Sequence, residues 1–520
     1  MKLKFSLHYR TEWGQSLHVV IAMFSGKRHL ATRDLIMTTA DGELWSLETS
    51  VMESRLRPVD SIEYNYQVED SCGRMLRREW CEVKRKYAFD GTANYIFPDS
   101  WRDVPGCIHL YSHLYSVSKG LPEDDGVTPC RIPLFRKTLV FRVSAPQVGE
   151  GEALAICGSH PTIGRWNPAH FVRMKYIGQH EWMLSLNAGI MPFPLEYKFV
   201  VIDAKSNTLL RWEQGENRTT DGLKMDDGDV LVLHGGLLHE PEPDWKIFGV
   251  RTAAPTPAFI KWAGSLGIHL IFIDGQQPFT TATFRHLRQL ADYARSLKVS
   301  LMTTVKVDLR RDLSIDRVRF RLRALEKALD AVSLEFRFPD DASLHPDYTA
   351  YLLRERLELI MSQTRMVVAQ HHSSYPDSLK AVFPAFHVLP VMLHCQPHNE
   401  QWEFAHLSEY PYYSIAATSL SHTPSLSRWW SEDPGRAQRY NVTILHSKGH
   451  APQNLTPAVA EAILARHAFS PSMICLAGMD DVEAMYEGHR KTMGLSTEEL
   501  SHAVNLNEKL QSLLRESHRR

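Results

Sequence analysis

Three short segments of the sequence carry the side chains best suited to chemistry. They are Gly158–Pro168 (GSHPTIGRWNP), Glu196–Phe199 (EYKF) and Arg211–Arg218 (RWEQGENR), and each lies at the edge of an expected strand. An exposed indole is a rigid apolar platform, whereas lysine, glutamate and asparagine exchange hydrogen bonds. This combination of residue types suits a ligand that has both an apolar face and a rim of hydroxyls, such as a sugar ring.

The elements that must position these residues have the pattern of β-sandwiches. The first half of the chain consists of short alternating runs between turn residues, with few helical periods. An internal repeat aligns Ile62–Trp80 without gaps on Leu195–Glu213, which predicts two duplicated sandwiches. We expect the first over residues 1–98 and the second over 137–238, with linkers at 99–136 and 239–250.

The second predicted sandwich resembles carbohydrate-binding module family 20, the starch-binding domain, through the three segments together. Its expected ligand is therefore an α-1,4-glucan such as starch, glycogen or a malto-oligosaccharide. A tryptophan in a sandwich is as often a core residue as a platform, and Trp182, on an alternating strand, is the one we assign to the core. The resemblance implies two stacking platforms and three polar contacts, namely Trp166, Trp212, Lys198, Glu213 and Asn217.

The first predicted sandwich departs from this pattern where the ligand would lie. The gap-free repeat puts Asn65 at the lysine and Glu79 at the second platform, and no tryptophan follows Phe24–Asp34. Trp80 is one residue out of register, which on a strand turns it to the other face. We therefore expect this module to have a weakened site, or none at the usual place.

The second half of the chain, residues 251–520, alternates apolar strands with helical periods. Seven strand-like runs in this length fit a shortened (β/α)8 TIM-type barrel. Apolar residues from Phe284 to Leu297 recur at helical spacing, and Thr456-Pro457 is the pattern of an N-cap followed by proline at the first helical position.

The barrel segment resembles the 4-α-glucanotransferases of the disproportionating-enzyme type (amylomaltases, glycoside hydrolase family 77), through SLSRWWSED and the closing segments that follow it. Retaining transfer requires a nucleophilic carboxylate, a carboxylic acid/base and a further carboxylate. The three family positions fall on Glu335, which has lost its flanking Arg and His, on Gln370 and on His422. An amide cannot exchange a proton near neutral pH, so we expect a catalytically degenerate member that binds glucan.

Two alternatives stay open. One is an active transglycosylase with Glu335 as nucleophile and an acid/base recruited from elsewhere. The other is a structural partner of an intact glucanotransferase that no longer binds glucan. A metal centre at the histidines is not expected, because their spacing matches no specific ligand set, and no cofactor is expected; these histidines are His371, His372, His394, His398 and His422.

Composition narrows the partners and the compartment. The 59 basic and 60 acidic side chains create no field to attract nucleic acid. No stretch approaches 18 uninterrupted apolar residues and the N-terminus lacks the apolar run of a signal peptide, so we expect no membrane association. Seven scattered cysteines suit reduced thiols, which favours a cytoplasmic protein. The sequence identifies no protein partner.

Overall fold

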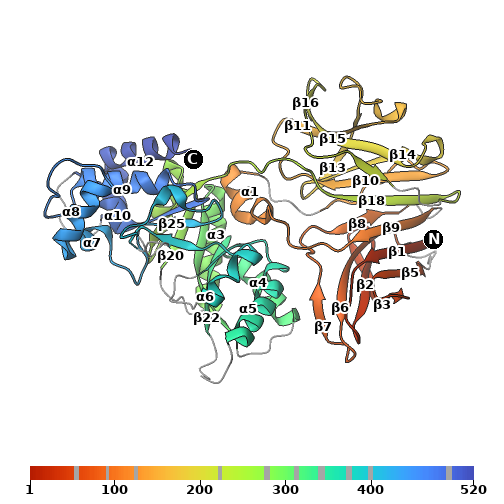
Figure 1. The fold of residues 1–520 in the computed structure, drawn as a ribbon, viewed down its shortest axis with the longest axis horizontal. Coiled ribbons are helices and arrows are strands. Elements are labelled where there is room, and N and C mark those ends of the chain that lie inside the picture. Colours follow the sequence, from red (N-terminus) through yellow and green to blue (C-terminus); the bar gives the residue numbers. More distant parts are fainter. Residues whose placement is uncertain are drawn as a thin grey trace. The chain divides into compact units, whose positions relative to one another are not determined.

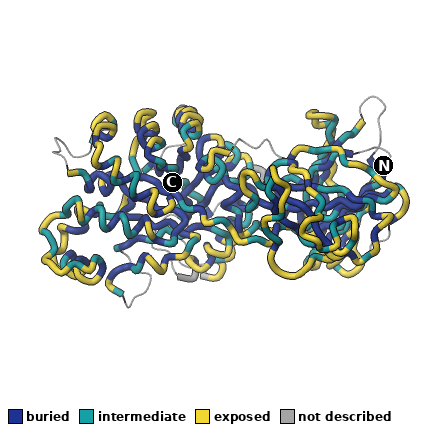
Figure 2. The backbone as a smooth tube through the Cα atoms, turned by 90° about the horizontal axis from the view of Figure 1, so that it is seen from above, coloured by how far each residue is buried: buried dark blue, intermediate teal, exposed yellow. Residues whose placement is uncertain are grey.

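The computed structural model describes residues 1–51, 58–89, 93–121, 127–220, 225–274, 281–309, 315–337, 346–370, 377–395, 402–487 and 495–519. The chain divides into two compact units. The first contains residues 1–110 and 123–243, and the second contains residues 111–122 and 244–520. Figure 1 shows the elements of both units, and Figure 2 shows that the central strands are buried while the turns and outer helix faces are exposed.

The first unit consists of two β-sandwiches that share one sheet. The shared sheet has the order β13-β14-β10-β18-β9-β1-β5-β4, and each sandwich adds a five-stranded sheet, β3-β2-β6-β7 with β8 or β12-β11-β15-β16 with β17. Most pairs are antiparallel, but β9 runs parallel to β1 and to β18, and β10 runs parallel to β18. The strands of the first sandwich are β1 (Lys2–His8), β2 (Ser16–Ser25), β3 (Arg28–Ile36), β4 (Thr38–Thr39), β5 (Leu44–Ser50), β6 (Ser61–Glu69), β7 (Met75–Arg78), β8 (Arg85–Ala88) and β9 (Asn94–Ser100). Those of the second are β10 (Thr138–Ser144), β11 (Glu152–Gly158), β12 (Val172–Arg173), β13 (Lys175–Gly178), β14 (Glu181–Asn187), β15 (Leu195–Asp203), β16 (Leu209–Trp212), β17 (Arg218–Thr220) and β18 (Asp229–Leu237), with 3-10 turns η2 (Pro161–Ile163) and η3 (Ala188–Ile190).

The two sandwiches are copies of one topology, as the repeat predicts. β6 and β15 occupy the same place in their sheets: β6 lies between β2 and the short strand β7, and β15 lies between β11 and the short strand β16. Alternate residues of β2 are buried, which is the period-2 pattern of a strand with one core face. Trp182 is 8% exposed and packs in the core of the second sandwich, so its assignment is confirmed.

The second unit is a barrel of eight parallel strands, so the predicted fold class is confirmed. The strand order is β23-β22-β21-β20-β19-β26-β25-β24, and backbone hydrogen bonds from Gln370 N to Leu389 O and from Leu389 N to Val368 O close the ring. Apolar side chains such as Leu270, Ala331 and Ile415 fill the interior. The strands are β19 (Ile247–Thr252), β20 (Leu270–Ile273), β21 (Ser300–Asp308), β22 (Ala331–Arg337), β23 (Val367–Gln370), β24 (Val391–Leu393), β25 (Ile415–Ala417) and β26 (Ile474–Gly478).

The first barrel strand, β19, is the one that the sequence pattern missed. It begins inside the segment expected to be a linker, and Gly249 interrupts its apolar run. A Cβ at Gly249 would lie 3.0 Å from atoms of Leu270, so the close approach of β20 favours glycine there. The barrel therefore begins at residue 247, ahead of the expected boundary at 251.

Helices surround the barrel, and one of them packs against its core from a segment far away in the sequence. The segment expected as a linker at 99–136 contains α1, which belongs to the barrel unit: Leu114 packs in the barrel core, and Trp245 donates a hydrogen bond to Ser118. The expected helix near Phe284–Leu297 and the Thr456 N-cap are both confirmed. The helices and 3-10 turns are η1 (Ile108–Tyr111), α1 (His113–Lys119), α2 (Pro257–Leu266), α3 (Thr281–Ser296), α4 (Ile315–Glu326), α5 (Pro346–Met361), α6 (Asp377–Lys380), η4 (Phe383–Phe386), η5 (Leu407–Glu409), α7 (Leu426–Glu432), α8 (Pro434–Thr443), α9 (Pro457–Ala468), α10 (Met479–Glu483), α11 (Thr497–His502) and α12 (Val504–Glu516). Among the described residues, none of these helices has the length and apolar character of a membrane span.

Candidate glucan-binding site

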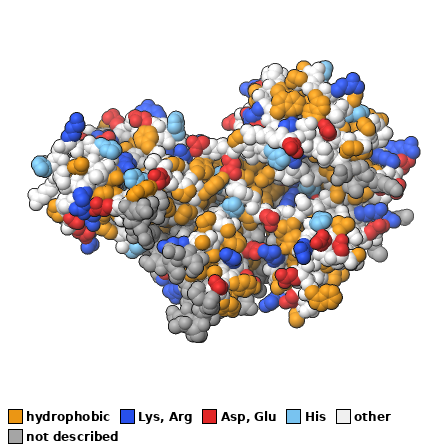
Figure 3. Space-filling model, in the orientation of Figure 1, with side chains coloured by type: hydrophobic (Ala, Val, Ile, Leu, Met, Phe, Trp, Pro, Cys, Tyr) orange, Lys and Arg blue, Asp and Glu red, His pale blue; other side chains and the backbone are white. Residues whose placement is uncertain are grey.

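Two indoles lie side by side at one end of the second sandwich. Trp166 follows η2, and Trp212 ends β16; their ring centroids are 6.3 Å apart and the rings are inclined by 41°. Both side chains are half-buried, and Trp212 also packs against the sandwich core. Hydrophobic side chains gather on the surface at this end of the module, near β11 and β16 (Figure 3). The structure thus brings the two predicted platform residues together as one angled apolar surface.

An unusual backbone conformation holds the first platform in place. Arg165 and Trp166 both have positive φ, 48° and 59°, which is uncommon for residues other than glycine. The amide of Trp166 donates a hydrogen bond to Gly158 O at 2.9 Å. Gly164 has φ 91°, and a Cβ there would lie 1.7 Å from His170 O. Strained residues of this kind persist where the surrounding structure fixes them, often at ligand sites.

The predicted polar contacts have two different environments. Lys198 is half-buried, and its Nζ donates to Gly215 O at 2.6 Å and to Glu213 O at 3.3 Å. Asn217 is exposed, and its Nδ2 lies 3.4 Å from Glu196 Oε2. Lys198 therefore fixes the loop that follows Trp212, while Asn217 presents its amide at the surface.

Glu213, predicted as a polar contact, is buried beneath the site and stabilises the loop that carries Trp212. Its side chain is 1% exposed; Oε1 accepts from Phe199 N at 2.8 Å and from Arg218 Nε at 2.9 Å. Arg218 continues to the backbone oxygens of Gly235 and Leu237. Arg218, which lies within the RWEQGENR segment, was not singled out from the sequence, and its five-residue spacing from Glu213 gives no helical or strand signal. The pair anchors the Trp212 loop to β15 and β18.

A second, more exposed ion pair supports the same strand. Arg211 donates to Glu152 at 2.5 Å and to Glu240 at 2.6 Å. The hydrogen bond from Arg211 holds the pKa of Glu152 below its usual value. These contacts fix the residue that precedes Trp212 in the chain.

A surface hollow of about 420 Å³ borders the Trp166 loop. Arg165, His170, Phe171 and Asn207 are among its lining residues, and no acidic side chain lines it. The surface beside the first platform is therefore polar and concave.

The first sandwich has lost this arrangement, and the structure corrects the expected register. Arg78 pairs with Gln67 where Trp212 pairs with Val200, so Arg78, and not Glu79, takes the place of the second platform. The reason is that the β6–β7 hairpin is one residue shorter than its counterpart. Glu79 is the equivalent of Glu213: it accepts from Tyr66 N and is paired with the buried Arg85.

Asn65 does stand at the lysine position, as expected, and it accepts a hydrogen bond from Arg78 NH2 at 2.8 Å. Trp80 is 6% exposed and lies beyond the end of β7, two residues after Arg78, so the corrected register removes the basis for the expected one-residue turn to the other face. Trp13, by contrast, is fully exposed on the turn before β2, and the described residues include no second ring in contact with it.

The three residues that the resemblance assigns to catalytic positions lie toward the carboxyl ends of the barrel strands. Glu335, on β22, is half-buried and lies 3.5 Å from Lys306 Nζ on β21. Gln370 ends β23, and its side chain is half-buried. His422 follows β25 and lines, with Ser333, a cavity of about 20 Å³, which is room for one water molecule. His371, His372 and His398 lie outside the described residues. His394 directly follows β24 and is 1% exposed.

Comparison with known proteins agrees with both resemblances. Residues 137–227 match the starch binding domain family, and residues 336–502 match the 4-alpha-glucanotransferase family. A curated relative, the 4-alpha-glucanotransferase DPE2 of Oryza sativa subsp. japonica, is 27% identical over 301 residues, which are 52% of this chain and 30% of the relative. The chain thus matches less than a third of the length of that relative.

Two solved structures are similar to separate parts of the chain. The family 20 module of the maltotetraose-forming amylase from Pseudomonas saccharophila STB07 is 20% identical, and the match covers 18% of this chain and 98% of that one with a TM-score of 0.15. The amylomaltase of Streptococcus agalactiae is 10% identical, with coverage of 46% and 61% and a TM-score of 0.33. At these TM-scores neither likeness carries a functional argument.

Proposed function

We propose that the protein binds α-1,4-glucan through its second sandwich without catalysing transfer. The proposal starts from the match of residues 137–227 to the starch binding domain family and of residues 336–502 to the 4-alpha-glucanotransferase family. The ligand class is starch, glycogen or malto-oligosaccharide. The barrel then acts as a scaffold or as an interaction surface.

The pair Trp166 and Trp212 is the observation that carries the proposal. Two indoles inclined by 41° match the curved, stepwise turn of an α-1,4 chain better than coplanar rings, because successive glucose units present their apolar faces at an angle. Asn217 is exposed five residues after Trp212, and its amide can hydrogen-bond the hydroxyl rim. Lys198 and Glu213 support this surface through the loop contacts described above. We therefore assign direct contact to the two indoles and Asn217.

The absence of transfer rests on side-chain chemistry. Gln370 and His422 replace two carboxylates, and Lys306 lies beside the remaining Glu335. General acid/base catalysis alone contributes about 10² to 10⁴ in rate, and a missing acid/base also prevents departure of the leaving oxygen. Glu335 by itself satisfies one of the three requirements of the retaining mechanism.

An active transglycosylase, with Glu335 as nucleophile, is the second candidate. Its specific support is that Glu335 is half-buried and follows Ser333 on the same face of β22, and Ser333 lines the cavity that His422 borders. A structural partner that does not bind glucan is the third, and the half-exposed indole pair opposes it, because exposed apolar surface without a ligand brings no benefit.

Co-sedimentation with insoluble starch tests the binding proposal. We expect the full chain to sediment with starch, and Trp166→Ala and Trp212→Ala each to weaken binding about tenfold. Trp13→Ala is the matched control, since it removes a fully exposed indole that has no partner ring among the described residues. Binding that survives the double substitution Trp166→Ala/Trp212→Ala would place the site elsewhere.

A further inference from the structure

We propose that the surface hollow beside the Trp166 loop is an additional subsite, which binds the glucosyl units that extend beyond the two on the indoles. This inference rests on the proposed function, because it assigns to the same site a preference for longer α-1,4-glucan chains. The hollow has a volume of about 420 Å³, which lies within the range of about 300–1,000 Å³ that is usual for pockets that bind small molecules. Its size therefore suits a sugar-sized part of the ligand.

The two elements that carry the indoles also form the walls of the hollow. One wall is the loop of residues 159–171, which carries Trp166 and contributes the preceding residue, Arg165. The other wall includes Asn207, which lies in the hairpin between β15 and β16, and β16 ends at Trp212. A glucan chain that lies on both rings therefore has the hollow next to it.

The lining of the hollow combines the residue types that suit a sugar ring. Phe171 contributes apolar surface, and it packs against the core of the sandwich, which holds it in place. Arg165 and Asn207 are exposed and contribute N–H donors to which hydroxyl oxygens can bind. None of the described lining residues is acidic, and within the described part of the chain the Arg165 guanidinium has no ion-pair partner. These donors are therefore available to a ligand.

The third polar group is His170, whose ring is held in one tautomer by Asn167. Oδ1 of Asn167 accepts a hydrogen bond from Ala169 N at 2.9 Å, and Nδ2 of the same amide lies 3.2 Å from His170 Nδ1. Because an amide nitrogen only donates, Nδ1 accepts and the proton of the neutral ring lies on Nε2. His170, which lines the hollow, thus has Nε2 as a hydrogen-bond donor.

The first sandwich shows that the fold itself does not require this loop. β2 and β11 occupy the same place in their sheets. In the first sandwich, however, only Gly26 and Lys27 separate β2 from β3, whereas residues 159–171 separate β11 from β12. The sandwich that has the indole pair thus also has the loop and its hollow, and the copy that has lost the pair has a two-residue turn instead. This association supports a role of both features in binding the same ligand.

Calorimetric titration of the full chain with maltose and with maltohexaose tests the inference. Maltose has two glucosyl units, one for each ring, so its affinity reports the indoles, whereas maltohexaose also reaches the hollow. We expect Arg165→Ala and Asn207→Gly each to weaken maltohexaose binding about threefold to tenfold, which is the effect of one lost hydrogen bond, and to leave maltose binding within about twofold. Asn207 has φ 55°, so glycine keeps the backbone conformation while it removes the amide.

Lys205→Ala is the matched control, because Lys205 is an exposed cation of the same hairpin that does not line the hollow. It should bind both oligosaccharides as the original chain does. Each ligand is compared with itself across the variants, so the larger number of positions at which maltohexaose can bind the rings cancels.

Two results would overturn the inference and leave the glucan-binding proposal intact. One is that the original chain binds both sugars and both variants bind maltohexaose as tightly as Lys205→Ala does. The other is that the variants weaken maltose as much as maltohexaose, because the two residues would then act on the two-ring site itself. If the original chain binds neither sugar, the glucan-binding proposal fails and the inference fails with it. If Arg165→Ala lowers the melting temperature through a change in its loop, Asn207→Gly decides, because Asn207 lies on the other wall.

Discussion

Replacing Glu213 by glutamine separates the two roles that this residue can have. The substitution preserves size and leaves an oxygen to accept from Phe199 N, but it leaves the Arg218 guanidinium without its carboxylate. Breaking a buried ion pair costs about 3–5 kcal/mol, and the retained hydrogen bond favours the lower end, about 3 kcal/mol. For a module of about 100 residues this corresponds to a fall in melting temperature of about 10–20 °C.

Calorimetry of the full chain measures this loss, and starch binding is measured on the same samples at 25 °C. Asp227→Asn is the matched control, because its pair with Arg136 is exposed and worth less than about 1 kcal/mol. We expect Glu213→Gln to lower the melting temperature strongly while folded protein binds glucan within about threefold of the original affinity. Unchanged melting together with a tenfold loss of binding would refute the reasoning and restore Glu213 as a direct contact.

Two further substitutions address the same module. Gly164→Ala places a Cβ 1.7 Å from His170 O at φ 91°, so we expect the Trp166 loop to change shape and starch binding to weaken. The matched control is Gly149→Ala, because the φ of Gly149 is negative and only Glu152 lies near its Cβ position, so co-sedimentation should stay unaltered. Equal binding by both variants would contradict the view that the shape of the Trp166 loop matters for binding. The pKa of Glu152 is lowered by Arg211, so its stabilising effect is present above the ordinary glutamate pKa and disappears as the pH falls through the lowered value. The melting temperature of Glu152→Gln should therefore lie below that of the original chain at pH 7 and converge with it in acid; a constant difference would contradict this sign.

The sequence predicts the architecture well because the strands have strong periodic patterns. Alternation along β2 and β15 and the repeat between the two sandwiches identify the modules, and the three segments of the second module predict which two tryptophans lie together. Loop conformations are less accessible: the positive φ of Trp166 depends on contacts with Gly158 and His170, which are long-range in the folded chain.

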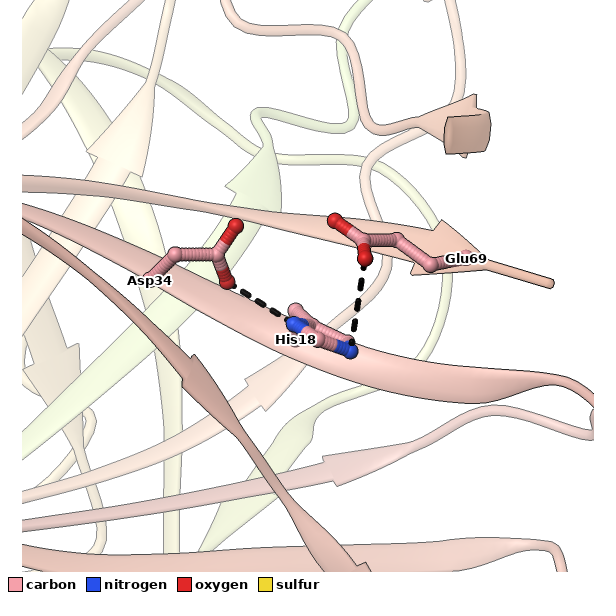
Figure 4. A group of neighbouring side chains, drawn as sticks. All are labelled: His18, Asp34 and Glu69. Atoms are coloured by element: carbon pink, nitrogen blue, oxygen red, sulfur yellow. Dashed lines mark hydrogen bonds and ion pairs between the residues drawn. The ribbon is translucent and has the colours of Figure 1, made fainter. Parts of the chain in front are cut away.

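The errors have equally physical origins. A gap-free alignment cannot detect that one hairpin is a residue shorter, and this moved Glu79 into the place of Arg78. β19 was missed because Gly249 breaks its apolar run, and α1 was taken as part of a linker because its place in the barrel depends on distant partners such as Trp245. The contacts of His18 with Asp34 and Glu69, one at each ring nitrogen, likewise depend on strand pairing and not on spacing along the chain (Figure 4).

Incubation of the purified chain with maltotriose, followed by analysis of the shorter and longer oligosaccharides, tests most directly the claim that it binds glucan without transferring it. We expect no disproportionation above background. Because residues beyond the three family positions also shape an acceptor site, we expect the triple variant Glu335→Asp/Gln370→Glu/His422→Asp to be inactive as well. Turnover by the unmodified chain that Glu335→Ala abolishes would establish the active-transglycosylase alternative. Turnover that Glu335→Ala leaves unchanged would contradict both accounts, because the chemistry would then lie on residues that neither account names.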